Sequence, residues 1–231
     1  MKSIKLAALT LICSTFLITA YSQDSEADKE TNKISASIEV LNEFTKMKEN
    51  IPAELLKITE GIIIIPGMKN AGFVVGGKRG KGIAVIKNAD GSWSNPVFIT
   101  LTGGSFGLQV GVQSVDLLLV FKKRNTLEEI GEGSFTLGGD ISATAGPVGR
   151  NSTASTDYKF EAEVYSYSRA KGLFAGLSIA GSAIDVDEKA NERFYGTEST
   201  AKEIFDNEIK SSPEETAPLK QTLQGLATGK K

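Results

Sequence analysis

Hydrophobic residues recur at two different periods along the chain, and the changes of period mark the predicted elements. Near the N-terminus, Ile34, Ile38, Leu41 and Phe44 follow spacings of three and four, which places them on one stripe of a helix. The polar face of this helix carries glutamates as well as lysines, so it lacks the strongly cationic face of a helix that lies on an anionic membrane. We therefore expect it to pack on the protein's own sheet.

A short helix and a long series of strands follow. Pro52 suits the first turn of a helix, which Gly61 can end. The run Ile62–Ile65 consists of β-branched residues, which predicts a strand buried on both faces and ended by Pro66. Further strands are predicted at Ala71–Gly77, Gly82–Lys87, Val97–Leu101, Ser105–Gln113, Leu117–Phe121, Thr136–Thr144 and Ala162–Arg169.

Glycines and polar residues mark the connections between these strands. Lys78-Arg79-Gly80-Lys81 predicts a basic turn, Asn88–Gly91 predicts a second turn, and Gly103-Gly104 predicts a break. We expect one helical turn at Thr126–Ile130 and a polar loop at Asn151–Asp157.

The helical period returns in the last part of the chain. Asp187 can cap a helix that ends at Gly196, and Thr200 with Glu203 forms a capping-box pattern. A final apolar stripe at helical spacing consists of Leu219, Leu223 and Leu226. Many strands between terminal helices predict an α+β fold: a curved, largely antiparallel, glycine-rich sheet with helices at the N- and C-terminal ends.

Length and composition are those of one folded domain with a polar leader. The 231 residues are 40% hydrophobic, which is enough to bury a substantial core, and the 24 glycines are concentrated between residues 61 and 181. Residues 23–33 are polar and without period, so we expect a flexible leader there. The domain is expected over residues 34–231, with a motif-bearing core at 51–196 and C-terminal helices at 197–231.

Residues 1–22 have the pattern of a secretory signal peptide. Lys2 and Lys5 precede the apolar run Leu6–Ile18, and Ala20-Tyr21-Ser22 offers small residues for cleavage. We therefore expect an exported protein, periplasmic or extracellular, that can associate with a membrane surface. A lipoprotein form is not expected, because Ile12 precedes Cys13 where a lipoprotein signal needs a small residue.

The residue types present limit catalysis and metal binding. The chain has no histidine, and its single cysteine, Cys13, lies in the expected signal peptide, which excludes histidine-based triads and the usual zinc sites. Asp116 and Asp140 have no calcium-loop spacing, and we expect them to satisfy buried partners rather than to catalyse. The sequence predicts no metal site and no cofactor.

Two short motifs imitate enzyme signatures without the context that those signatures need. Gly72–Lys78 matches the first seven positions of a P-loop, but Arg79 stands where a hydroxyl must hold Mg²⁺, and a strand follows instead of a helix. Ser168 and Lys171 have S-x-x-K spacing, but the companion motifs of serine acyl-transferases are absent from the sequence. We therefore expect no catalytic residues and no enzymatic activity.

Net charge directs attention to local basic clusters. The chain has 26 lysines and arginines against 28 acidic residues, and removal of Lys2 and Lys5 would leave 24 against 28, or −4. This balance predicts no nucleic-acid partner. If several basic turns meet at one end of the sheet, they could hold lipid phosphates at about 1 kcal/mol per cation. The candidate lipid-binding residues are Lys78, Arg79 and Lys81; Lys122, Lys123 and Arg124; Arg150; and Arg169 with Lys171.

One residue of this set has a structural alternative. Arg169 could be buried and paired with an acid such as Asp116 or Asp140, in which case it would hold the fold together rather than meet a ligand.

Four segments resemble one known family, in its motif order. They are WSNPVFITLTGGSFGLQVGVQSVDLLLVF (Trp93–Phe121), LGGDISATAGPVGR (Leu137–Arg150), EVYSYSRAKGLFAGLSIAGSAI (Glu163–Ile184) and NERFYG (Asn191–Gly196). Together they resemble the SYLF (Ysc84-like) family of lipid-binding and actin-regulator-related domains, in its exported bacterial form. The resemblance covers about residues 51–196, and it implies binding to phospholipid. Actin regulation does not transfer to an exported chain, because the actin-linked members act in eukaryotic cytoplasm.

Two functions remain open at this point. The first is an exported, non-enzymatic lipid-binding module that docks on anionic phospholipid or a membrane surface through the basic turns. The second is a structural or protein-partner module of the cell envelope that has no lipid ligand.

Overall fold

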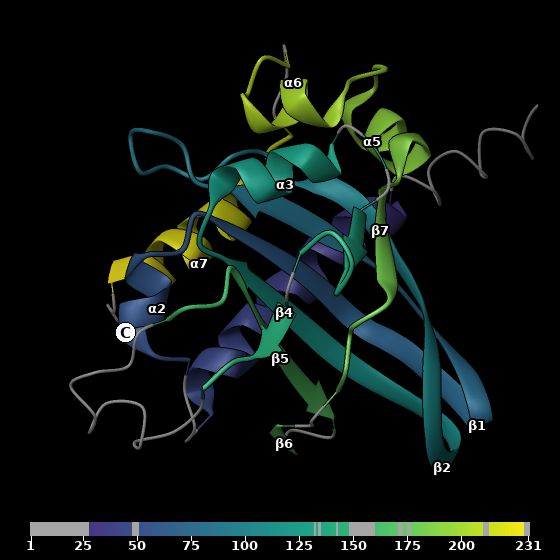
Figure 1. Cartoon of the computed structure of the whole chain (residues 1–231). Helices are drawn as coiled ribbons and strands as arrows, with labels where there is room; N and C mark the ends of the chain where they lie inside the picture. The colour runs from purple at the N-terminus through teal and green to yellow at the C-terminus, as the bar shows by residue number, and fades with distance from the viewer. Residues whose placement is uncertain are drawn as a thin grey trace, which may run out of the picture.

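The computed structural model describes residues 28–47, 51–131, 133, 135–141, 143–147, 160–170, 173–174, 177–209 and 213–228. These residues form a seven-stranded, mainly antiparallel sheet that curves strongly, with helices toward both ends of the chain (Figure 1). The α+β fold expected from the sequence is confirmed. The expected signal peptide over residues 1–22 and the polar loop at 151–157 lie outside the described residues.

Two long strands dominate the sheet. β1 (Gly61–Ile86) and β2 (Val97–Phe121) pair in antiparallel register along almost their whole length. The predictions of a basic turn at residues 78–81 and of a break at residues 103–104 are wrong. Both segments lie within the ladder, where Lys78 pairs with Gly103 and Arg79 pairs with Thr102.

Glycines let the ribbon of β1 and β2 fold back on itself (Figure 1, lower right). The ladder changes register after Ile65 and again after Gly72. Beyond these shifts, Gly80 and Gly82 lie against the first part of β1, and a Cβ at Gly82 would lie 2.0 Å from the carbonyl oxygen of Ile64. Glycine at these positions therefore serves the close approach of backbones and not a turn.

Pro66 was expected to end the strand, and this prediction is wrong: β1 continues through Pro66, which lies at the first register shift. Proline has no N–H to donate to a ladder, so it is tolerated where the pairing is interrupted. Gly67, with a φ of +58°, donates its N–H to the carboxylate of Asp116 at 2.9 Å. Pairing resumes at Met68, opposite Val115.

Shorter strands complete the sheet along the other edge of β2. β7 (Ser182–Val186) pairs with the first part of β2, and β5 (Val164–Ala170) pairs with its last part. The outer strands are β3 (Phe135–Leu137) beside β7, with β4 (Ala143–Ala145) and β6 (Leu173–Phe174) beside β5.

The single strand predicted over Thr136–Thr144 is wrong. Residues 138–140 form a turn between β3 and β4, and Gly138 takes a φ of +86° in this turn, a conformation that glycine adopts readily. β4 then pairs in parallel with β5.

Helices cover both faces of the curved sheet. On one face, α3 (Arg124–Ile130) and α6 (Ala201–Phe205) join a core with the inward-facing side chains of β1 and β2. The other face is covered by the N-terminal helix (residues 28–46), α2 (Ala53–Lys57) and α7 (Thr216–Thr228). α5 (Glu188–Tyr195) contributes side chains to both cores.

Local capping signals placed the C-terminal helices correctly. Asp187 caps α5 by accepting the N–H of Ala190, and the helix ends at Gly196 in the left-handed conformation. Thr200 and Glu203 form the predicted capping box of α6.

The N-terminal helix packs on the sheet, as its mixed-charge polar face indicated. Ile34, Leu41 and Phe44 are each 1% exposed. The helix begins earlier than expected, because residues 28–33, which the sequence assigned to the flexible leader, are already helical. Among the described residues, no helix combines the length and the apolar composition that crossing a membrane requires.

Candidate functional site

Arg169 is a half-buried residue of β5 and not an exposed turn residue. It lies opposite Asp116 of β2, and its side chain is 14% exposed. The guanidinium donates to the Asp116 carboxylate at 2.6 Å and to Glu43 of the N-terminal helix at 3.1 Å. The pairing of Arg169 with Asp116, one of two acids named as alternatives, is therefore confirmed.

The basic cluster that follows β2 is largely engaged within the protein. Arg124 donates to Glu128 at 2.6 Å and to Asp206 at 2.8 Å, which ties the start of α3 to the end of α6. Lys122 donates to a backbone carbonyl. Lys123 forms a surface ion pair and keeps 64% of its side chain exposed.

The basic cluster on β1 is divided between the two faces of the strand. Lys78 is 5% exposed and donates to the carbonyl oxygen of Ser178 at 2.5 Å, and burial lowers the pKa of its ammonium group. Arg79 and Lys81 lie on the other face and are exposed. Lys81 donates to the carboxylate of Asp187 at 2.6 Å.

The nine predicted lipid-binding residues therefore fall into three groups. Arg79, Lys81 and Lys123 are exposed; Lys78, Lys122, Arg124 and Arg169 are buried or half-buried and hold partners within the fold; Arg150 and Lys171 lie outside the described residues. Their role in lipid binding stays a prediction.

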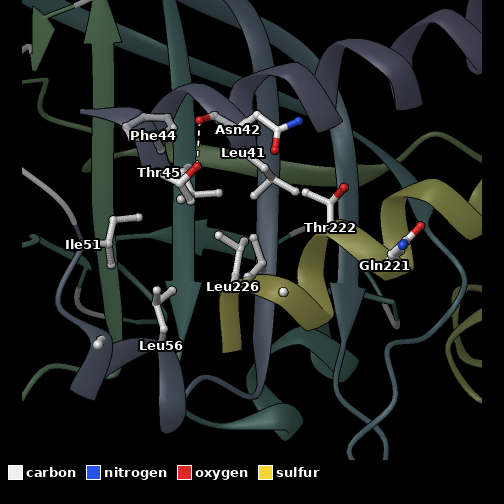
Figure 2. Close-up of a pocket in the computed structure, with 13 residues that line it drawn as sticks. Leu41, Asn42, Phe44, Thr45, Ile51, Leu56, Gln221, Thr222 and Leu226 are labelled. Carbon is white, nitrogen blue, oxygen red and sulfur yellow. Dashed lines mark hydrogen bonds between the residues drawn. The ribbon is translucent and has the colours of Figure 1, made fainter. Parts of the chain in front are cut away.

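An apolar pocket opens between three helices (Figure 2). Its walls are the N-terminal helix, α2 and α7, and side chains of β1 and β2 lie at its base. The volume is about 450 Å³. The lining residues are Leu41, Asn42, Phe44, Thr45, Ile51, Ala53, Leu56, Ile62, Leu118, Gln221, Thr222, Gly225 and Leu226.

The threonines of this helix-lined pocket direct their hydroxyls to their own helices. The Thr45 hydroxyl donates to the carbonyl oxygen of Asn42 at 2.7 Å, and the Thr222 hydroxyl donates to that of Pro218 at 2.9 Å. Both donors are thus satisfied within the helix that carries them. The pocket consequently presents mainly carbon atoms to a ligand.

Gly225 keeps the α7 side of the pocket open. A Cβ at this position would meet no heavy atom from other parts of the structure within 4 Å. Glycine in a helix costs about 0.5–1 kcal/mol relative to alanine, and packing offsets this cost, since Leu219 and Leu223 of α7 are fully buried.

The walls of this pocket come from residues 41–56 and 221–226, which are far apart in the chain, so the sequence pattern does not predict it. Periodicity predicts which residues face inward, but it does not show where three helices leave a gap. The one signal available was Gly225, a glycine within the helical stripe of Leu219, Leu223 and Leu226. Within the described residues, no group of three or more potential metal-binding side chains gathers at any point.

The family model and three relatives that match this chain are described by the name Ysc84 or by binding to Las17. The family model described as "Ysc84: Las17-binding protein actin regulator" matches residues 102–226. LAS seventeen-binding protein 3 of Saccharomyces cerevisiae is 38% identical over 202 residues, which cover 86% of this chain and 44% of that protein.

Two further relatives extend the comparison. Protein YSC84 of Saccharomyces cerevisiae is 36% identical over 202 residues, which cover 86% of this chain and 43% of that protein. SH3 domain-containing YSC84-like protein 1 of Homo sapiens is 32% identical over 173 residues, which cover 72% of this chain and 50% of that protein. The chain thus spans about half the length of these relatives. The family model covers more than half of the chain, and the chain therefore belongs to the SYLF (Ysc84) family.

Proposed function

We propose that this protein is a non-enzymatic lipid-binding module that takes an acyl chain into the helix-lined pocket and docks on an anionic membrane surface. The pocket is the observation that carries the proposal. Sites for small ligands are mostly apolar cavities of roughly 300–1,000 Å³ with few polar groups, and this pocket has about 450 Å³ and satisfied threonine hydroxyls. An acyl chain that leaves water for such surroundings gains about 0.8 kcal/mol per methylene.

The preference for anionic lipid rests on the exposed cations. Arg79, Lys81 and Lys123 are accessible, and the side chains of Lys81 and Lys123 are 53% and 64% exposed. The ion pair of Lys123 with Glu163 lies at the surface, and exposed ion pairs contribute only about 0–1 kcal/mol, so a lipid phosphate can replace this carboxylate at little cost. Arg124 and Arg169 are poorer candidates, because their removal from partly buried carboxylates is costly.

The cellular location of the proposed function rests on residues 1–22. We infer that this segment is a secretory leader and that the protein acts in the periplasm or outside the cell. Its membrane association would then be peripheral.

The second candidate is a protein-partner module without a lipid ligand. The description of the matching family model names binding to Las17 and actin regulation, and one relative is named as a LAS seventeen-binding protein. In this alternative the partner of this chain would be an envelope protein, and the helix-lined pocket would receive an apolar side chain of that partner.

Substitution at Gly225 tests the lipid function. The probe is phosphatidic acid with two eight-carbon chains, titrated as a monomer into the purified chain by calorimetry. Gly225→Phe should fill the open space and weaken binding at least tenfold, whereas Gly225→Ala should bind like the wild type and melt at the same or a higher temperature. Equal binding by the folded Gly225→Phe variant would remove the pocket from the proposal.

Vesicle co-sedimentation tests the membrane part. Salt-sensitive binding to phosphatidylglycerol vesicles, with little binding to phosphatidylcholine vesicles, is the expected result. Absence of binding to both vesicles and to the monomeric lipid would favour the protein-partner function.

A further inference from the structure

A second, smaller cavity lies between the N-terminal helix, β1 and the start of α5. We name it the lysine niche, and its charged lining residues are Lys29, Glu30, Lys33, Lys81, Asp187 and Arg193. Its volume is about 110 Å³. A water molecule occupies about 30 Å³ of liquid, so the niche has the size of a small tetrahedral ion rather than of a nucleotide.

The two acids of the niche are already paired with two of its four cations. Arg193 donates to the Oε1 atom of Glu30 at 2.5 Å, and Lys81 donates to the Oδ2 atom of Asp187 at 2.6 Å. None of the ion pairs between described residues includes Lys33. The lining thus carries more positive than negative charge, which favours an anion.

Lys33 is held in an unfavourable position for a cation. Burial lowers the pKa of its ammonium group, and the nearby charge of Lys81 lowers it further, while the carboxylate of Glu30 opposes both effects only in part. A bound anion would relieve the repulsion between Lys33 and Lys81.

Glu30 adds a requirement on the kind of anion. The residue is 5% exposed, and its second oxygen, Oε2, is buried without a hydrogen-bond partner among the described residues. A buried carboxylate oxygen needs a donor. Hydrogen phosphate carries both negative charge and a P–OH donor, whereas sulfate at neutral pH carries no proton.

We propose that the lysine niche binds a hydrogen phosphate group. Lys33 and Lys81 contact its anionic oxygens, and Glu30 accepts a hydrogen bond from its P–OH group. The group could be inorganic phosphate or the phosphate monoester of a lipid headgroup. The niche stands apart from the helix-lined pocket: Lys33 and Leu41 are eight residues apart on one helix, about 12 Å along its axis. Its occupation does not depend on acyl-chain binding.

The test measures binding of inorganic phosphate to the full chain by calorimetry, with sodium sulfate at the same ionic strength as the comparison. The wild type should bind phosphate at least tenfold more tightly than sulfate. Lys33→Gln should lose at least tenfold in phosphate affinity, and in chloride it should melt at the same or a higher temperature because a repulsion is removed.

Lys220→Gln is the matched control. Lys220 is also half-buried, and burial alone lowers the pKa of its ammonium group, but it lies on α7 and does not line the niche. This variant should bind phosphate like the wild type. Unchanged phosphate affinity in Lys33→Gln, equal affinity for sulfate, or an equal loss in Lys220→Gln would overturn the proposal.

The pH dependence provides a second readout. Bound phosphate favours the charged form of Lys33, so affinity should fall as the pH rises through the lowered pKa of that group. Lys33→Gln should lose this dependence. Should Lys33→Gln fail to fold, Lys81→Gln provides the same comparison, because it removes the other cation proposed to contact the phosphate.

Vesicles distinguish the two sources of the phosphate group. If the source is a lipid headgroup, inorganic phosphate should displace the protein from phosphatidic acid vesicles, and Lys33→Gln should bind them weakly. Phosphate binding without such displacement identifies a soluble ligand, and either result upholds the niche. Gly225→Phe should retain phosphate binding, which separates failure of the niche from failure of the pocket.

Discussion

At the scale of single residues, Arg169 shows how one side chain joins distant parts of the fold. Its two carboxylate partners come from β2 and from the N-terminal helix, and one of them, Asp116, also accepts the backbone N–H of Gly67 in β1. One partly buried network of charged groups therefore connects four segments: β1, β2, β5 and the N-terminal helix. Removing one member of such a network leaves a partly buried charge without its partner. This lowers the free energy of unfolding more than replacing the whole network with apolar residues would.

We expect Arg169→Ala to destabilise the protein by about 3–5 kcal/mol, because the partly buried carboxylate of Asp116 loses its charged partner. Urea unfolding followed by circular dichroism measures this change. Lys123→Ala removes an exposed ion pair and should change the free energy of unfolding by less than about 1 kcal/mol. Similar small effects of both substitutions would show that Arg169 is solvated in solution.

The sequence offered Asp116 and Asp140 as partners of Arg169, but it could not decide between these two acids or between pairing and exposure. A strand residue and its neighbours alternate between the two faces, and the face that is buried depends on register. Lys78 illustrates the difficulty: it lies beside the exposed Arg79, yet it is 5% exposed. A basic run in the sequence thus contained both a core residue and surface residues.

At the scale of elements, helices were predicted better than strands for a physical reason. Caps such as Asp187 and the capping box at Thr200 act within a few residues, so sequence alone shows them. A glycine in a strand pattern is ambiguous in sequence, since it can mark the end of the strand or a position where another backbone packs closely. The pattern at residues 78–81 predicts a turn, whereas in the structure Gly80 and the following Gly82 let the first part of β1 pack closely.

Two glycine substitutions test the folded ribbon. Gly82→Ala should destabilise the protein by about 1–3 kcal/mol, the usual cost of overpacking, because the new Cβ would meet the carbonyl oxygen of Ile64. Gly104→Ala is the matched control, since a Cβ there has no neighbour within 4 Å and the position also lies in the ladder. Thermal unfolding distinguishes the two, and a neutral Gly82→Ala would contradict the close approach of the two parts of β1.

At the scale of the whole molecule, the N-terminal helix closes one face of the sheet and borders both proposed sites. Glu30 near its start pairs with Arg193 of α5, and Glu43 near its end pairs with Arg169 of β5. These anchors are 13 residues apart, or about 20 Å along the helix. Sequence periodicity identified the buried stripe of this helix, but the pocket and the niche depend on partners from the C-terminal part of the chain, which periodicity does not reveal.

This arrangement predicts that the protein binds lipid with the N-terminal helix in place. Detachment of the helix would expose Ile34, Leu41 and Phe44, together with the sheet residues that they cover, and would break both anchoring ion pairs. Apolar burial contributes about 1.5–3 kcal/mol for each large side chain. The docked helix should therefore persist when the protein binds phosphatidylglycerol vesicles.

Hydrogen exchange measured by mass spectrometry checks this prediction, with the chain alone and with vesicles. Peptides from residues 28–46 should exchange as slowly with vesicles as without them, and peptides from β2 serve as the internal reference. Trp93, the only tryptophan, is 3% exposed in the same core, so its emission should keep its wavelength. Faster exchange in residues 28–46 upon vesicle binding, with a red-shifted Trp93, would mean that the helix leaves the sheet, and the acyl chain would then have no closed pocket to enter.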